Sequence, residues 1–144
     1  LFKHNTYCDN INMKRETGRG YVYGLQYHIV WCVKYRHQLL IDAVGDSLKE
    51  MLCAIAKDNG FEIVELNTDK DHVHMLIACK PQHYIPNIIK ALKGNSARFM
   101  FKKHPELKKR LWGGHMWNPS YFITTVGEAS EDQVKHYIQS QGQK

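Results

Sequence analysis

Two histidines separated by one residue, His72 and His74, stand in an otherwise apolar stretch, HVHMLIAC at 72–79. Side chains alternate across a β-strand, so both imidazoles leave one face about 7 Å apart, at roughly 3.3 Å per residue. Such a pair can bind one divalent ion, and imidazole suits transition metals whereas Mg²⁺ prefers oxygen ligands. The alternative is a chance pair, since the chain has nine histidines. The other face of this stretch is fully apolar, so we expect helices to cover that face and leave the histidine face free.

Two acidic residues come just before the histidines, at Asp69 and Asp71. Carboxylates in this position can orient an imidazole by accepting a hydrogen bond from its second nitrogen. We interpret them instead as solvated residues of a polar turn at 68–71.

A second group of reactive side chains lies near the end of the chain. Val134, Tyr137, Ile138 and Gln141 follow the spacing of one helix face, which stacks Tyr137 and Gln141 one turn apart. A tyrosine can act as a covalent nucleophile when its deprotonation is assisted, and an ion held by two histidines can polarise a phosphate for that attack. Gln141 can lend an amide oxygen as a third ligand. The alternative is an amphipathic helix whose tyrosine packs on the sheet.

The order of elements along the chain is β-α-β-β-α-β-α. The expected strands are at 21–35, 61–67, 72–79 and 117–126, and the expected helices are at 42–59, 83–103 and 130–141. Strands are indicated by aromatic and β-branched residues, and helices by one-sided apolar stripes. The pattern predicts an α+β, ferredoxin-like split βαβ antiparallel sheet with helices on one face and an appended C-terminal helix that carries the tyrosine.

The composition limits the class of protein. The chain has 144 residues, 43% of them hydrophobic, which is one domain's worth: a flexible basic leader at 1–20 and a single domain at 21–144. The longest uncharged stretch, 111–127, contains Gly, Asn and Pro and does not predict a membrane span. The cysteines form no Cys-x-x-Cys pair, and we interpret Cys32, Cys53 and Cys79 as small buried hydrophobes in a reducing compartment. Glycine-rich nucleotide-binding loops are absent, so no nucleotide cofactor is expected.

The net charge of +6 favours an anionic partner such as nucleic acid. Basic side chains would contact phosphates and aromatic faces would accept unstacked bases. The candidate DNA-binding residues are Lys34, Tyr35, Arg36, His37, Lys90, Lys93, Arg98, Lys108, Lys109 and Arg110. For each of them the alternative is a solvated surface charge. Trp31 and Trp117 lie in expected strands and are predicted to be core residues.

Four segments together resemble the small single-tyrosine HUH transposases of bacterial insertion sequences, a group that includes palindrome-associated domesticated relatives. They are DHVHMLI, the upstream YHIVWCVKYRHQLL, the later WNPSYFITTVG, and the final helix with Tyr137 and Gln141. The similarity runs from about Tyr21 to Gln141. It rests on the order and spacing of the segments, because no single one is specific.

The resemblance implies a transposase that cleaves and rejoins single-stranded DNA at hairpin-bearing element ends. Tyr137 would form a 5′-phosphotyrosine, and His72, His74 and Gln141 would hold one Mg²⁺ or Mn²⁺ ion per active site. It also implies a homodimer, with active sites that two subunits can share, and a cytoplasmic location in bacteria.

Two other classes of function stay open at the level of sequence. One is a non-catalytic module of ferredoxin-like fold that binds single-stranded nucleic acid or hairpins, with Tyr137 packed and the histidines merely polar. The other is a metallohydrolase that releases its product to water.

Overall fold

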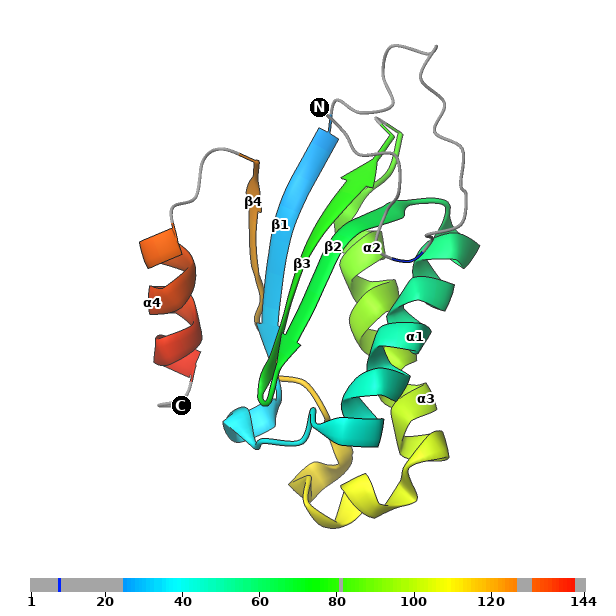
Figure 1. Cartoon of the computed structure of the whole chain (residues 1–144), viewed down its shortest axis with the longest axis vertical. Helices are drawn as coiled ribbons and strands as arrows, with labels where there is room; N and C mark the ends of the chain where they lie inside the picture. The colour runs from blue at the N-terminus through cyan, green and yellow to red at the C-terminus, as the bar shows by residue number, and fades with distance from the viewer. Residues whose placement is uncertain (1–7, 9–24, 81, 127–130, 142–144) are drawn as a thin grey trace.

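The computed structural model describes residue 8 and residues 25–80, 82–126 and 131–141, and its centre is one antiparallel β-sheet. The strands are β1 (Leu25–Cys32), β2 (Glu62–Asp69), β3 (His72–Cys79) and β4 (Phe122–Thr125). They lie in the order β2-β3-β1-β4, so β1 and β3 are central (Figure 1). This order is that of the split βαβ arrangement, and the expected α+β, ferredoxin-like fold class is confirmed.

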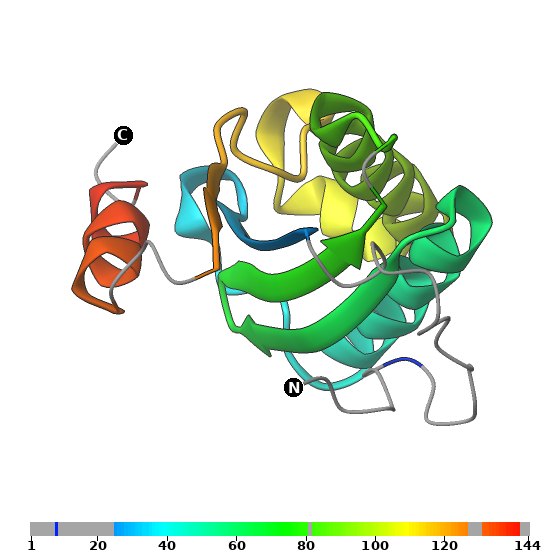
Figure 2. The same cartoon turned by 90° about the horizontal axis from the view of Figure 1, so that it is seen from above.

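Helices lie on both faces of the sheet. On one face are α1 (Asp42–Asn59), α2 (Ile85–Lys90) and α3 (Ser96–Lys103), and α4 (Glu131–Gln141) lies on the other (Figure 1). Figure 2 shows the same separation from above, with β4 between α4 and the rest of the sheet. Helix α2 continues into α3 through one π-helical turn, Ala91–Asn95, a local widening of the helix that is frequent at functional sites.

The hydrophobic core lies between the sheet and α1–α3, as the alternation at 72–79 predicts. Its members include Ile29, Trp31, Leu48, Leu52, Val73, Met75, Ile77 and Leu92. Burying an aliphatic side chain of this size contributes about 1.5–3 kcal/mol each. Trp31 packs edge-to-face on Trp117, with ring centres 5.7 Å apart, and both are buried, so their prediction as core residues is confirmed.

Two strands are shorter than expected. The end of β1 and the start of β4 both lie near the candidate site. After β1 the chain turns through a 3₁₀ turn at Lys34–Arg36, where Tyr35 has φ 56° and Arg36 has φ 54°. β4 begins only at Phe122, three residues after Pro119, which has no N–H to donate to a ladder. The expected strands at 21–35 and 117–126 therefore extend too far, although residues 21–24 lie outside the described residues.

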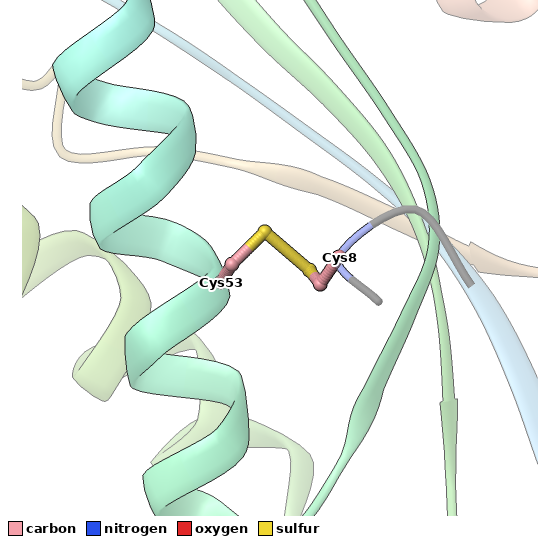
Figure 3. Close-up of a disulfide and its surroundings, with 2 residues drawn as sticks. All are labelled: Cys8 and Cys53. Atoms are coloured by element: carbon pink, nitrogen blue, oxygen red, sulfur yellow. A yellow bond between two sulfur atoms is a disulfide. The ribbon is translucent and has the colours of Figure 1, made fainter. Parts of the chain in front are cut away.

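The interpretation of Cys53 as a buried hydrophobe is wrong. Cys53 on α1 forms a disulfide with Cys8, with Cα atoms 5.5 Å apart (Figure 3). Cys32 and Cys79 are free and buried, as expected. Apart from Cys8, the predicted flexible leader at 1–20 lies outside the described residues. Within the described ranges, no helix is both long enough and apolar enough to cross a membrane.

Candidate active site

The histidine pair lies on the sheet face opposite to the core. In the register of β1 and β3, His72 pairs with Cys32 and His74 pairs with Val30. The ring of His74 lies against that of His28, with centres 5.6 Å apart. Burial, reinforced by the two neighbouring imidazoles, lowers the pKa of His74 below its usual 6.5. The lowered pKa favours the uncharged ring, which is the form that binds metal ions.

The expectation that helices leave the histidine face free is wrong, because α4 covers part of it. The ring of Tyr137 on α4 lies 5.5 Å from that of Phe122, which pairs with Val30 on β1. Both Phe122 and Val30 share the face of His74 through the register of the sheet. The tyrosine helix and the histidine pair are therefore on the same face, although they are far apart in sequence.

Asp71 is an integral part of the site, so its interpretation as a solvated turn residue is wrong. It is only 8% exposed, and its Oδ1 lies 3.0 Å from Nδ1 of His72. Its Oδ2 accepts a hydrogen bond from Nε of Arg36 at 2.8 Å. Burial alone would raise the pKa of Asp71, but the hydrogen bonds from His72 and Arg36 outweigh burial and lower it. Asp69, by contrast, is exposed, and its carboxylate accepts a hydrogen bond from the N–H of Lys70, as that of a turn residue does.

Polar side chains from the segment before β4 hold the reactive groups of α4, and the sequence did not indicate this role. Gln141 is only 5% exposed, and its Oε1 accepts hydrogen bonds from Nδ2 of Asn118 at 2.8 Å and from Oγ of Ser120 at 2.9 Å. The hydroxyl groups of Ser120 and Tyr137 are 3.0 Å apart. The only signal in the sequence is the short polar run after Trp117, which lies inside the expected strand at 117–126.

Lys93 fixes that segment from the opposite side. Its Nζ donates to the carbonyl oxygens of Asn118, Pro119 and Ser120 at 2.8, 3.2 and 3.0 Å. Burial lowers the pKa of Lys93 to about 8, so the ammonium is still charged at neutral pH and has three donors for three acceptors. Lys93 lies in the π-helical turn, which places it within reach of these carbonyls.

One side chain joins the two halves of the site. Nη1 of Arg36 donates to the backbone carbonyl of Ile138 at 3.1 Å, while its Nε binds Asp71. The helix that carries Tyr137 is thereby linked to the carboxylate that contacts His72. Among the described residues, neither Tyr137 nor Gln141 is hydrogen-bonded to either histidine.

The two histidines fit the divalent ion that the resemblance implies, because Asp71 occupies Nδ1 of His72 and leaves Nε2 for a ligand bond. Gln141 fits less directly, since both lone pairs of its oxygen accept hydrogen bonds in this arrangement. One of these bonds would have to be released. In the described part of the chain no three His, Cys, Asp or Glu side chains gather to hold an ion.

The predicted DNA-binding residues fall in three places. Lys34, Tyr35, Arg36 and His37 lie at the turn after β1, Lys90, Lys93 and Arg98 on the helical run from α2 to α3, and Lys108, Lys109 and Arg110 at a 3₁₀ turn, Pro105–Lys109. Tyr35 is 55% exposed and Lys34 Nζ lies 5.1 Å from its ring centre. The donors of Lys93 are all used within the chain, which argues against a phosphate contact there.

The sequence of the chain is similar to those of known transposases. The family model described as "Transposase IS200 like" matches residues 21–141. The chain is 52% identical over 132 residues to the ISDra2 transposase TnpA of Deinococcus radiodurans, covering 92% of this chain and 94% of that protein. It is 26% identical over 117 residues to the transposase of insertion sequence element IS200 of Salmonella typhimurium, covering 79% and 77%.

Two solved structures are similar to this chain. A crystal structure of a putative transposase from Deinococcus radiodurans R1 has a TM-score of 0.80 and 52% identity, covering 88% of this chain and 97% of that one. The structure of a REP-associated tyrosine transposase bound to a REP hairpin has a TM-score of 0.53 at 14% identity, covering 89% and 68%, and shows likeness of fold alone. The fold, the shared sheet face and these matches together establish that the chain belongs to the IS200-like transposase family.

Proposed function

We propose that this transposase cleaves and rejoins single-stranded DNA at hairpin-bearing element ends, with Tyr137 as the nucleophile. The observation that carries the proposal is that α4 places Tyr137 on the same sheet face as His72 and His74. In cleavage the phenol oxygen bonds to phosphorus, the bond to the 3′ oxygen breaks, and that oxygen takes a proton to become a free 3′-OH. The 5′-phosphotyrosine keeps the energy of the phosphodiester, so rejoining needs no nucleotide cofactor.

The contacts of Tyr137 prepare it for this role. The hydroxyl of Ser120 donates to Gln141, so the phenol donates to Ser120 and its oxygen keeps a lone pair for attack. Burial raises the pKa of Tyr137, and the hydrogen bond with Ser120 opposes that rise. The hydrogen bond with Ser120 also holds the side chain of Tyr137 in one place, which favours attack on a bound phosphate.

His72 and His74, with Gln141 after release of a hydrogen bond, would hold one Mg²⁺ or Mn²⁺ ion. A bound ion would neutralise charge on the non-bridging oxygens of the scissile phosphate. Asp71 would keep the ring of His72 in the orientation and tautomer that leaves Nε2 free.

Exposed aromatic side chains beside cations support single-stranded DNA as the substrate. Tyr35 lies beside Lys34, and Phe99, 42% exposed, lies beside Arg98 at 5.6 Å from the ring centre. Aromatic faces that accept unstacked bases are worth about 1–3 kcal/mol per base. The solved relative bound to a REP hairpin supports a hairpin as the element that is recognised.

We also propose a homodimer in the bacterial cytoplasm, with active sites that the two subunits can share. β2 and β4 are the edge strands of the sheet, and unpaired edges are surfaces to which another chain can add. Sedimentation analysis of the full chain tests the dimer: a monomer at all concentrations would contradict it.

The test of the function is a covalent adduct. Wild-type protein with Mn²⁺ and a hairpin-bearing single strand should yield protein-linked DNA, and Tyr137→Phe should yield none while binding the hairpin equally well. If the wild type forms no adduct but binds the hairpin, the chain is a non-catalytic binding module. Free 5′-phosphate without protein-linked DNA would indicate a metallohydrolase.

A further inference from the structure

Arg36 lies between the two halves of the candidate active site and contacts both. Its Nε is 2.8 Å from Oδ2 of Asp71, and its Nη1 is 3.1 Å from the carbonyl oxygen of Ile138, the residue after Tyr137. Asp71 in turn lies 3.0 Å from Nδ1 of His72. A chain of three hydrogen bonds therefore runs from the backbone of α4 to the first histidine of the pair.

The backbone around Arg36 is strained and held in place. Tyr35 and Arg36 are consecutive non-glycine residues in the left-handed region, at φ 56° and 54°, a strained conformation that persists only where surrounding contacts impose it. Those contacts are present on both sides of the turn. The N–H of Val33 donates to the carbonyl of Asp71 at 2.9 Å, and that of Leu40 donates to the carbonyl of Lys70 at 2.9 Å. The turn is thereby fastened to the connection between β2 and β3, with the guanidinium directed at Asp71 and α4.

The side chain is also poorly placed to leave these partners for DNA. The side chain of Asp71 is 11% exposed, so removing the guanidinium would leave a buried carboxylate with one partner fewer. A planar guanidinium can bridge two acceptors that lie in different directions, whereas a single ammonium cannot reproduce its fork geometry. The two contacts of Arg36 therefore depend on the shape of the guanidinium group and not on its charge alone.

We propose that Arg36 is a positioning residue, which orients His72 through Asp71 and fixes the tyrosine helix through Ile138, so that the ion-binding and nucleophilic halves of the site are held together. This inference rests on the proposed function, in which His72 holds the ion and Tyr137 attacks. It assigns Arg36 a role different from the phosphate contact that its charge suggested.

The first test is Mn²⁺ binding by the full chain without DNA, measured by titration calorimetry. Arg36→Gln should weaken Mn²⁺ binding by about 10–100-fold, the usual cost of removing the support of a metal ligand. Arg98→Gln is the matched control, because Arg98 is exposed and, within the described residues, its guanidinium hydrogen-bonds to Asn95 on the same helical run and to neither half of the site. Unchanged Mn²⁺ binding by Arg36→Gln would overturn the proposal.

The second test is amide hydrogen exchange in α4, which needs neither metal nor DNA. Arg36→Gln should speed exchange at 135–141, and Arg98→Gln should not. Arg36→Lys keeps the positive charge but loses the planar guanidinium. It should show the same two defects, weaker Mn²⁺ binding and faster exchange in α4, and it serves as the test variant if Arg36→Gln does not fold. Protection of α4 equal to the wild type in either variant would overturn the proposal.

The third test separates positioning from a DNA contact. A phosphate contact at Arg36 would lower the salt slope of hairpin binding by about 1 in Arg36→Gln and leave Mn²⁺ binding intact. Positioning predicts an unchanged slope. Different results would contradict the inference and the proposed function. If the wild type forms no DNA adduct, the proposed function is wrong. If the wild type forms the adduct but Arg36→Gln has normal Mn²⁺ binding and normal exchange in α4, only the role of Arg36 is wrong.

Discussion

The hydroxyl of Tyr137 lies 3.0 Å from the hydroxyl of Ser120, and the hydroxyl of Ser120 donates a hydrogen bond to Oε1 of Gln141, 2.9 Å away. One serine thus contacts both the proposed nucleophile, Tyr137, and the proposed third ion ligand, Gln141. Ser120 is itself placed by Lys93, which binds its carbonyl oxygen at 3.0 Å. The position of the reactive phenol therefore depends on residues from three separate segments.

Replacing Ser120 by Ala should raise the pKa of Tyr137. Burial already raises this pKa, and the serine hydroxyl opposes the rise because it can turn and donate to the phenolate. The alkaline titration of Tyr137, followed by nuclear magnetic resonance with tyrosine labelled at the ring, should shift to higher pH. Ser140→Ala is the control, since Ser140 donates to the backbone carbonyl of Tyr137 at 2.8 Å and not to its phenol. A shift of equal size in both variants would contradict this role of Ser120.

Replacing Lys93 by Met should loosen the segment that holds Tyr137 and Gln141. Three carbonyl oxygens would lose a charged donor, and hydrogen bonds to charged groups contribute about 1.5–3 kcal/mol at most sites. We expect a lower free energy of unfolding in urea and less DNA adduct, with hairpin affinity unchanged. Lys57→Met, at an exposed position on α1, should have neither effect. A loss of hairpin affinity in Lys93→Met with normal stability would instead support a phosphate contact.

The same lysine predicts a pH dependence with a definite sign. Burial lowers its pKa from 10.5 to about 8 in the folded protein. Between these two values the unfolded chain holds a proton that the folded chain has released, so raising the pH favours folding. The difference in unfolding free energy between wild type and Lys93→Met should therefore shift in favour of the wild type as the pH rises from 8 to 10.5. Urea denaturation at several pH values measures this difference in unfolding free energy. A difference that does not change with pH would contradict the lowered pKa.

The sequence predicted the parts of the site that depend on local periodicity. The period of two at 72–79 placed both histidines on one face, and the helical spacing near the C-terminus placed Tyr137 and Gln141 one turn apart. The contacts that join these parts depend on tertiary register. Arg36 and Asp71 are 35 positions apart, and Lys93 and Asn118 are 25 apart, so no local pattern brings them together. For the same reason Asp71 looked like a solvated turn residue.

Replacing His72 or His74 by Ala should abolish adduct formation without removing DNA binding. The imidazoles lie on the face that α4 covers and outside the hydrophobic core, so their loss should leave the fold intact. Hairpin affinity should stay within about tenfold of the wild type, which corresponds to 1.4 kcal/mol. Electrophoresis under denaturing conditions detects the adduct, and filter binding measures affinity. Adduct formation at the wild-type rate in both variants would show that the histidines take no part in the chemistry.

The basic turn at Lys108 and Lys109 should contribute to affinity and not to chemistry. Each phosphate contact releases about 0.7 counterion from single strands and about 0.9 from duplex DNA, so a double Ala variant should lower the salt slope of hairpin binding by about 1.4 to 1.8. Replacing Lys49 and Lys57 on α1 by Ala removes the same charge from the face of the sheet opposite to the histidines, and should leave the slope unchanged. The comparison removes the effect of net charge, because both variants lose two positive charges. Equal slopes in the two double variants would show that the protein's overall charge, and not this turn, attracts DNA.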